Sequence, residues 1–306
     1  MRIAVTGAGG FIGANLVRLL LRDGHDVVAI LRARSSRVRL AGIEPVTFAE
    51  ADVCDAAALA VALRRHQPEV VYHLASSTWN PAAQPSDHET TIVRGMESLL
   101  AACAQTPPRR LIVTGSAAEY GSGVGFDEHS PCRPDTALGA AKAAACRLAT
   151  LIAPSQGIEC VWLRLFTPYG PFEAPSRLVP SAIRAALDQR SFVLRAPQEE
   201  RDFLAVSDAA AAMARAAWVP LPNPAILNLC SGQPTRVSDL VNLVFACVGA
   251  RADYRIQPTA GLRSGETLAR SSGSNRRAAD WLGYSPRLDL RAGIEEAIAW
   301  WKEHTS

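Results

Sequence analysis

Short runs of apolar, mostly β-branched residues alternate with longer amphipathic stretches along the first half of the chain. The short runs predict buried strands at residues 3–5, 27–31, 70–74, 111–113 and 160–163. The longer stretches predict helices at residues 15–21, 56–66, 90–104 and 138–152. Strands and helices that alternate in this way form a parallel sheet with right-handed crossovers and helices on both faces. The pattern therefore predicts an α/β fold built on a doubly wound parallel sheet.

The sequence changes character after Pro168, where proline becomes frequent and loops separate the helical patterns at residues 178–187 and 237–248. We interpret this part as a smaller C-terminal lobe that is interleaved with strands returning to the sheet. The predicted sheet domain comprises residues 1–168 with returning segments near 200–232, and the predicted lobe comprises residues 169–199 and 233–306.

Composition narrows the classes of protein that fit. The chain has 306 residues, of which 48% are hydrophobic and 20% charged, and its formal net charge is +3. A charge this small does not indicate nucleic acid or an anionic membrane as the partner, and no uninterrupted apolar run reaches the ~18 residues of a membrane helix. The strand pattern begins directly after Met1 and leaves no room for a signal peptide, so we expect a cytoplasmic protein.

The cysteines and histidines do not indicate a metal site. The seven cysteines are widely spaced and form no C-x-x-C pair, and the six histidines form no H-E-x-x-H pair. We therefore expect reduced, mostly buried thiols and no bound metal.

A glycine-rich segment, Thr6-Gly7-Ala8-Gly9-Gly10-Phe11-Ile12-Gly13, follows the first predicted strand and opens the first predicted helix. In this context Gly7 permits a tight turn, Gly10 lets the backbone approach a pyrophosphate, and Gly13 allows close packing of helix on strand. The N–H groups at the start of the helix, around Phe11 and Ile12, would then hold the phosphates. The segment predicts a dinucleotide site of the Rossmann type.

The end of the second strand indicates which dinucleotide is bound. A carboxylate there would bind the ribose 2′-hydroxyl of NAD, whereas an arginine would pair with the 2′-phosphate of NADP. This sequence has Leu31 followed by Arg32 and further arginines, with no acid. We therefore favour NADP(H) over NAD(H), with a solvated basic loop or a small nucleic-acid patch as the alternatives. Asp52 and Val53, after the third strand, are expected to meet the adenine.

Several stretches together resemble the extended short-chain dehydrogenase/reductase family of NAD(P)-dependent nucleotide-sugar epimerases, dehydratases and 4-ketoreductases. They follow the family's order over nearly the whole chain. The matching stretches are TGAGGFIG at 6–13, ADV at 51–53, HLASS at 73–77, GSAAEYG at 115–121, Lys142, LRLFTPYGP at 163–171, ERDFLAVSDAA at 200–210, NLCSG at 228–232 and LGYSP at 282–286.

The resemblance implies a role for individual residues. Ser116 would bind the sugar oxygen at the reacting carbon, and Lys142 would bind the nicotinamide ribose and place a positive charge beside the reaction. The implied cofactor contacts also include Leu74, Ala75, Ser76, Leu165 and Pro168. The implied substrate contacts, on a nucleotide-diphosphate sugar, are Thr167, Arg177, Arg201, Arg263 and Glu266. An arginine suits a diphosphate because its planar fork meets two oxygens at once, although surface ion pairing is the alternative for Arg201 and Arg263.

One position departs from the family pattern. The family's acid/base residue is a tyrosine four positions before the lysine, one helical turn away on the same face. Here that position is Leu138, and none of the five tyrosines can be shifted into its place. A leucine side chain carries no proton. A replacement acid could be Glu119, His129, Asp135 or Cys146, but loop solvation or core packing is the simpler interpretation of each.

A second departure concerns the positions directly after Ser116. Relatives that eliminate water carry an Asp-Glu pair there, whereas this chain has Ala117 and Ala118. Elimination is disfavoured because no acid/base pair can serve it. Three hypotheses remain: a 4-ketoreductase that obtains its proton from Lys142, Ser116 or water, a 4-epimerase, and a catalytically silent dinucleotide-binding protein. We favour the first, because hydrogen bonds and the Lys142 charge can stabilise a developing alkoxide.

The helical patterns at residues 90–104 and 138–152 carry more small and apolar residues than one buried face needs. The resemblance implies that these helices pair with their symmetry mates in a homodimer through a four-helix interface. Two ordinary helices that cover the sheet are the alternative.

Overall fold

The computed structural model describes residues 1–77, 84–257 and 270–304. Its centre is a seven-stranded sheet in the order β11-β7-β5-β4-β1-β2-β3, in which every neighbouring pair is parallel. The strands are β1 (Arg2–Thr6), β2 (Asp26–Leu31), β3 (Thr47–Glu50), β4 (Val70–His73), β5 (Arg110–Ser116), β7 (Glu159–Leu165) and β11 (Ala225–Leu229). The predicted doubly wound fold is confirmed. The strand order reverses between β1 and β4, and in such sheets ligands bind in the crevice at that point.

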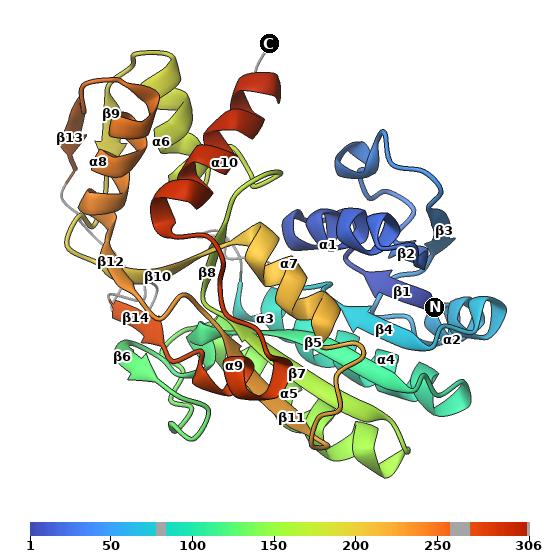
Figure 1. Ribbon diagram of the computed structural model, residues 1–306. Helices are drawn as coiled ribbons and strands as arrows, with labels where there is room; N and C mark the ends of the chain where they lie inside the picture. The colour runs from blue at the N-terminus through green and yellow to red at the C-terminus, as the bar shows by residue number, and fades with distance from the viewer. Residues whose placement is uncertain (78–83, 258–269, 305–306) are drawn as a thin grey trace.

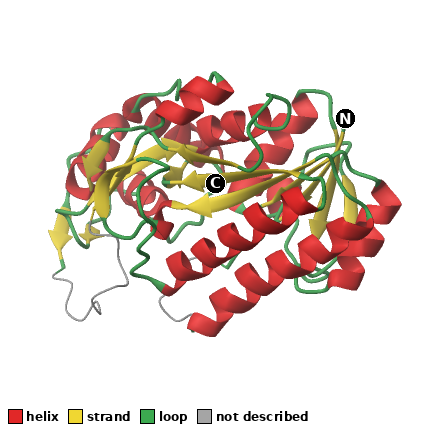
Figure 2. Ribbon diagram, turned by 90° about the horizontal axis from the view of Figure 1, so that it is seen from below, coloured by secondary structure: helices red, strands yellow, loops and turns green. Residues whose placement is uncertain are grey.

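Helices cover both faces of this sheet (Figures 1 and 2). Alternate residues of β1 enter opposite layers, as a pleated strand requires: Val5 packs with the first layer and Ala4 with the second. The first layer contains α1 (Phe11–Arg22), α7 (Val206–Arg215) and α9 (Arg276–Leu282). The second layer contains α2 (Ala56–His66), α4 (Gly95–Gln105) and α5 (Ala137–Ser155).

By length and composition alone, the 19-residue α5 could cross a membrane. In this fold it is a core helix, because Ala145 and Ala149 are fully buried in the layer that covers β5 and β7. Helix α4 begins later than the sequence pattern predicts. It is preceded by α3 (Pro85–His88) and by a π-helical segment, η2 (Glu89–Arg94).

The second half of the chain builds a lobe with its own apolar core (upper left in Figure 1). Its helices are α6 (Leu178–Leu187), α8 (Val237–Val248) and α10 (Leu290–His304). A second sheet joins β6 (Gly123–Phe126), β8 (Thr167–Tyr169), β10 (Glu200–Ala205), β12 (Pro234–Arg236) and β14 (Arg270–Gly273), and a two-stranded sheet joins β9 (Phe192–Leu194) and β13 (Tyr254–Ile256). The chain does pass back and forth: β10 belongs to the second sheet, whereas α7 and β11 return to the first. The domain boundaries themselves stay a prediction.

Two buried aspartates connect segments that lie far apart in the sequence. Asp202 accepts hydrogen bonds from the backbone N–H of Ser231 at 2.6 Å and of Gly232 at 2.9 Å. Asp208 accepts the Tyr284 hydroxyl at 2.7 Å and the backbone N–H of Arg287 at 3.1 Å. Three of the stretches that carry the resemblance, at 200–210, 228–232 and 282–286, are therefore joined by structural hydrogen bonds.

Candidate active site

The glycine-rich turn after β1 leaves no room for side chains at two of its glycines. Gly7 has a φ of +69°, and a Cβ there would stand 2.5 Å from the Ala75 nitrogen. A Cβ on Gly13 would stand 2.2 Å from the Gly7 carbonyl oxygen. Gly10 caps α1, and its N–H bonds the Gly7 carbonyl at 2.9 Å. The helix start is thus open to an anion, with Phe11 and Ile12 in its first turn, and the turn fits a dinucleotide pyrophosphate.

A basic loop folds against this turn. A Cβ on Gly9 would stand 2.9 Å from the Ser36 carbonyl oxygen, and Arg39 donates to the Gly9 carbonyl at 3.4 Å. Arg32 and Arg34, at the start of this loop, are exposed. A basic loop that contacts the glycine-rich turn fits the ribose end of a dinucleotide.

The predicted adenine contacts follow β3. Asp52 Oδ1 accepts the Cys54 backbone N–H at 2.9 Å, which shapes the turn. Val53 is buried and would lie 3.3 Å from a Cβ on Gly95, at the start of α4. Asp52 itself is exposed at the sheet edge.

The carboxyl ends of four strands meet at the same edge of the sheet. Thr6 pairs in register with His73, and Ser116 pairs with Leu165. The Thr6 hydroxyl contacts His73 Nδ1 at 2.8 Å. Leu74 and Ala75 continue from β4 onto the glycine-rich turn, with Ser76 next along the chain. Thr167 and Pro168, in β8, pair with Phe203 and Leu204 of β10, so they belong to the second sheet.

Ser116 is the last residue of β5, and two hydrogen bonds fix it, one through its backbone N–H and one through its side chain. Its N–H donates to Glu119 Oε1 at 2.8 Å, and its Oγ accepts the Ala118 N–H at 3.1 Å. This is a capping box, in which each side chain satisfies the backbone N–H of the other residue. The side chain of Ser116 remains partly exposed toward the crevice, whereas Glu119 is fully buried.

The Glu119 carboxylate also binds two residues of β7. Oε1 accepts the Trp162 indole N–H at 2.9 Å, and Oε2 accepts Arg164 Nε at 2.7 Å. A Cβ on Gly115 would stand 2.5 Å from Oε1, so a glycine is needed there to admit the carboxylate. Arg164 in turn donates to the Tyr120 hydroxyl at 2.8 Å.

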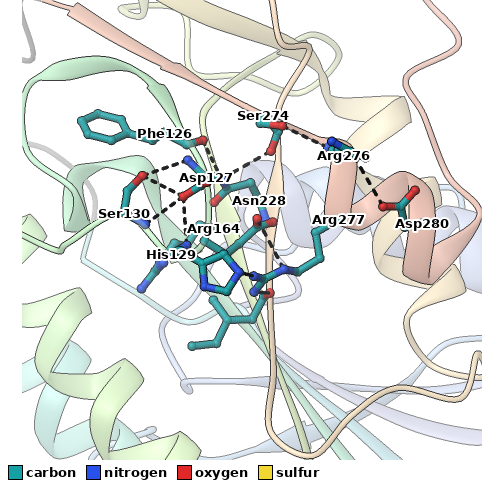
Figure 3. A network of polar contacts seen from close by, with 12 residues as sticks. Phe126, Asp127, His129, Ser130, Arg164, Asn228, Ser274, Arg276, Arg277 and Asp280 are labelled. Atoms are coloured by element: carbon teal, nitrogen blue, oxygen red, sulfur yellow. Dashed lines mark hydrogen bonds and ion pairs between the residues drawn. The ribbon is translucent and has the colours of Figure 1, made fainter.

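The contacts continue from Tyr120 to the loop after β6. The Tyr120 hydroxyl donates to Asn228 Oδ1 at 2.7 Å, and Asn228 donates from Nδ2 to the Phe126 carbonyl at 3.0 Å. Figure 3 shows Asn228 between Phe126 and Arg277, which also contacts His129 at 2.7 Å. Hydrogen bonds thus connect Glu119, through Arg164 and Tyr120, to Asn228 of β11.

The first turns of α5 lie directly against the Ser116 turn. Thr136 caps the helix, and its Oγ1 accepts the Gly139 N–H at 3.1 Å. A Cβ on Gly139 would stand 2.2 Å from the Ala118 carbonyl oxygen, so α5 approaches η3 (Ala117–Glu119) at backbone contact. The first turns of α5, which carry Leu138 and Lys142, therefore pack against the turn that follows Ser116.

Lys142 is buried, 7% exposed, and its Nζ donates to the Thr114 carbonyl at 2.7 Å. Burial lowers the pKa of Lys142 to about 8, and the Glu119 charge offsets this in part. Burial, together with the Lys142 charge, lowers the pKa of His73 to about 3. The imidazole of His73 is therefore neutral near pH 7, and Lys142 carries the positive charge at this edge of the sheet.

The structure describes only some of the charged residues predicted to bind the substrate, and those it describes lie in different parts of the lobe. Arg201, in β10, forms an ion pair with Glu199 at 2.5 Å, and its Nε is buried without a hydrogen-bond partner among the described residues. Arg177 is exposed at the start of α6, 3.9 Å from Glu173. Arg263 and Glu266 lie outside the described residues.

The four candidate replacement acids are all engaged elsewhere. Glu119 is held in its ion pair, and His129 is exposed and contacts Arg277. Asp135 accepts the Ser122 backbone N–H at 3.1 Å. Cys146 is buried, and burial raises the pKa of its thiol.

Sequence reasoning did not find the Glu119–Arg164 pair or a second pair, Ser77 and His88, whose Oγ and Nδ1 lie 2.7 Å apart. The burial of Glu119, Arg164 and His88, which only the structure shows, singles these pairs out. Among residues 1–77, 84–257 and 270–304, no group of three or more His, Cys, Asp or Glu side chains could hold a metal.

The glycine-rich turn on a doubly wound sheet, with a serine and a buried lysine at the edge of the crevice, defines a Rossmann protein with the site of a short-chain dehydrogenase/reductase. The model of the NAD dependent epimerase/dehydratase family matches residues 3–230. The chain belongs to this family, and its relatives are of the extended type that the sequence resembles.

Individual relatives extend the comparison over the whole chain. The UDP-glucose 4-epimerase of Mycolicibacterium smegmatis is 29% identical over 315 residues, 99% of each protein. A probable dTDP-glucose 4,6-dehydratase of Sinorhizobium fredii is 32% identical over 243 residues, 72% of this chain and 67% of the relative. The crystal structure of the Thermus thermophilus UDP-glucose 4-epimerase in complex with NAD has a TM-score of 0.89 and 26% identity, and the match covers 99% of each chain.

Proposed function

We propose that this protein reduces the 4-keto group of a nucleotide-diphosphate sugar, a 4-keto-6-deoxy sugar in particular, with NADPH. The observation that supports this most directly is the grouping of Ser116 and the buried Lys142 at the sheet edge, with the aliphatic Leu138 where relatives carry tyrosine. The family and the activities in the names of the relatives support the substrate class.

Reduction suits a site of this composition. When bound, the nicotinamide supplies a hydride. The Ser116 hydroxyl can donate a hydrogen bond to the sugar oxygen, and the Lys142 ammonium can stabilise negative charge that develops there. The remaining proton would come from Lys142, from Ser116 or from water.

The other reactions of the family need groups that this site lacks. Elimination of water needs an acid/base pair after Ser116, where the chain has the buried Ala117 and Ala118. Epimerisation at C4 is the second candidate, because full-length relatives carry that name. Epimerisation requires that a proton be removed and then returned, so the replacement of the family's tyrosine by Leu138 affects both half-reactions. A catalytically silent dinucleotide-binding protein is the remaining alternative.

The cofactor proposal rests on the end of β2. Leu31 is buried there, with its side chain 3.4 Å from a Cβ on Gly9, and no carboxylate follows it, whereas the exposed Arg32 comes next in the chain. A guanidinium at this place suits the 2′-phosphate of NADP. The Thermus thermophilus relative was crystallised with NAD, so a direct comparison of both cofactors is needed.

The proposed substrate contacts use Ser116, Thr167 and the cations of the lobe. Arg201 is the first candidate for the diphosphate, because its buried Nε lacks a partner among the described residues while Glu199 holds its other end. Arg177 is exposed at the start of α6, with Glu173 3.9 Å away, and is the second candidate for the diphosphate.

One assay separates the three candidates. The purified protein is incubated with NADPH and dTDP-4-keto-6-deoxyglucose or its UDP counterpart, and the absorbance of the reduced nicotinamide is followed. A reductase consumes NADPH only when the keto sugar is present. An epimerase instead releases tightly bound dinucleotide on denaturation and converts UDP-glucose without net NADPH consumption. If neither occurs while the dinucleotide still binds, the binding-protein alternative replaces the proposal.

We also infer a homodimer through α4 and α5. The outer face of α5 carries the exposed Ala140, Ala144, Arg147 and Leu151, and the exposed fraction of Leu151 is 66%. The small and aliphatic side chains of this face suit pairing with a second copy. Light scattering after gel filtration tests this, and Leu151→Lys should shift a dimer toward monomer.

A further inference from the structure

The proton that completes a ketone reduction has no obvious source among the residues carried over from the family. Leu138 has no ionisable atom. The Lys142 ammonium donates one of its three N–H groups to the Thr114 carbonyl, and giving up a proton to the sugar would remove the charge that stabilises the alkoxide. Within the part of the chain that the structure describes, no acidic group hydrogen-bonds the Ser116 hydroxyl, and an unassisted serine is a weak acid. A donor on another element would leave the Lys142 charge in place.

The helical segments α3 and η2 lie between β4 and α4 in the chain and pack beside the helix that carries Leu138. Helix α3 follows β4 along the chain, and the first turn of α5 packs against η3, which directly follows β5. Both α3 and η2 pack against α5. His88 stands at the junction of α3 and η2, on the helical run that contacts the helix of Leu138 and Lys142. A π-helical segment such as η2 is rare and is often found at functional sites.

His88 is paired with a serine of the cofactor groove. Its Nδ1 lies 2.7 Å from Ser77 Oγ, and the imidazole is only 6% exposed. Ser77 comes two residues after Ala75, whose backbone nitrogen touches the glycine-rich turn. The pair therefore connects the cofactor groove with the helices that cover the sheet beside Leu138.

We propose that Ser77 and His88 form the proton relay that replaces the missing phenol, with Ser77 meeting the sugar oxygen and His88 acting through it. This inference rests on the proposed function and names the proton source of that same site. Histidine is the side chain most often used for proton transfer near neutral pH. In this arrangement it supplies the acid that a serine hydroxyl lacks.

Atoms and electrons balance in this step. When bound, NADPH would supply the hydride for the new C–H bond at C4, and the carbonyl π electrons would move to oxygen. The Ser77 O–H bond breaks as its proton passes to that oxygen, and the imidazolium N–H of His88 passes its proton to Ser77 Oγ. His88 is left neutral and takes up a proton from solvent. In the oxidative direction the same two groups accept the proton.

The test is single-turnover oxidation of bound NADPH by dTDP-4-keto-6-deoxyglucose, with cofactor affinity measured separately. His88→Gln can keep a hydrogen bond to Ser77 but cannot deliver a proton, so we expect the rate to fall about 100-fold or more with an unchanged Kd for NADPH. Ser77→Ala should lose a similar factor, whereas Ser77→Thr, which keeps a hydroxyl, should recover most of the rate. Ser86→Ala, at an exposed position of α3, is the matched control.

The outcomes separate this inference from the proposed function. If the wild type reduces the keto sugar and His88→Gln or Ser77→Ala stays within threefold of it, the relay is wrong and the function stands. If the wild type reduces no keto sugar, the proposed function fails and the relay fails with it. Addition of imidazole to His88→Ala distinguishes proton transfer from a structural role, since only a missing proton carrier is restored. If imidazole does not restore the rate of His88→Ala and this variant also binds NADPH more weakly, the relay is overturned as well.

Discussion

The carboxylate of Glu119 and the guanidinium of Arg164 form an ion pair inside the protein, with 2.7 Å between Oε2 and Nε and side-chain exposures of 0% and 6%. The other carboxylate oxygen holds the backbone N–H of Ser116. The pair therefore links strand β7 to the turn that presents the candidate active-site hydroxyl. A charge pair with so little solvent is stable only while both partners are present.

Removing the Glu119 carboxylate should therefore lower the free energy of unfolding by more than the loss of one ordinary hydrogen bond would. Glu119→Gln leaves Arg164 buried without its counter-charge, and we expect the free energy of unfolding to fall by about 3–5 kcal/mol. Urea denaturation monitored by tryptophan fluorescence measures it. The control is Asp188→Asn in the exposed pair with Arg190, where a change below about 0.5 kcal/mol is expected. Equal effects of the two substitutions would show that the buried pair does not stabilise the fold.

Lys142 should impose a basic limit on turnover. Its pKa is lowered to about 8 by burial, so the ammonium loses its proton, and with it the stabilising charge, as the pH rises through that value. We expect kcat to fall above about pH 8, and Lys142→Ala to abolish reduction. Because Glu119 raises the pKa of Lys142, Glu119→Gln should move the fall to lower pH. Unchanged turnover in Lys142→Ala would remove the lysine from the mechanism.

Arg32 should determine which dinucleotide binds more tightly. Its guanidinium is exposed at the end of β2, where it can pair with a 2′-phosphate but gains little from a 2′-hydroxyl. We expect Arg32→Ala to weaken NADPH binding by about tenfold and NADH binding much less, as measured by fluorescence titration. Arg190→Ala, a surface arginine remote in sequence, serves as the control. An equal loss for both cofactors would contradict the preference for NADP(H).

Glu173 should make the protein less stable as the pH rises. It is 8% exposed, its Oε2 lacks a hydrogen-bond partner within the described residues, and burial raises its pKa to about 8 despite the nearby Arg177. The folded state thus keeps a proton that the unfolded chain releases near pH ~4.3. Between these two values the folded state binds more protons, so stability falls with rising pH.

Glu173→Gln removes this dependence. Its stability relative to the wild type should increase from pH 5 to pH 8 by at most about 1.4 kcal/mol per pH unit. Urea midpoints at both pH values measure the difference, with Glu295→Gln, at an exposed position of α10, as the control. Parallel behaviour of wild type and Glu173→Gln would show that the carboxyl is ionised in the folded protein.

The sequence predicts the main sheet and the cofactor turn well, because both follow from local constraints. A strand or helix repeats its apolar residues at its own period, and the glycines at 7 and 13 stand where the backbone leaves no space for a Cβ. The four-residue spacing of Leu138 and Lys142 likewise places them on one helical face before any fold is known. A cytoplasmic location is also expected from the sequence and stays a prediction.

Only the tertiary structure decides which polar residues meet. Glu119 and Arg164 are 45 positions apart, and His88 is separated from Ser77 by a change of element. A glutamate after a strand or a histidine at the junction of two helical segments has the same local pattern whether it is solvated or buried. Packing of β7 and α5 around the Ser116 turn excludes water from Glu119. Packing of α3 against α5 excludes water from His88. Long-range burial thus decides their role, and no pattern of neighbouring residues encodes it.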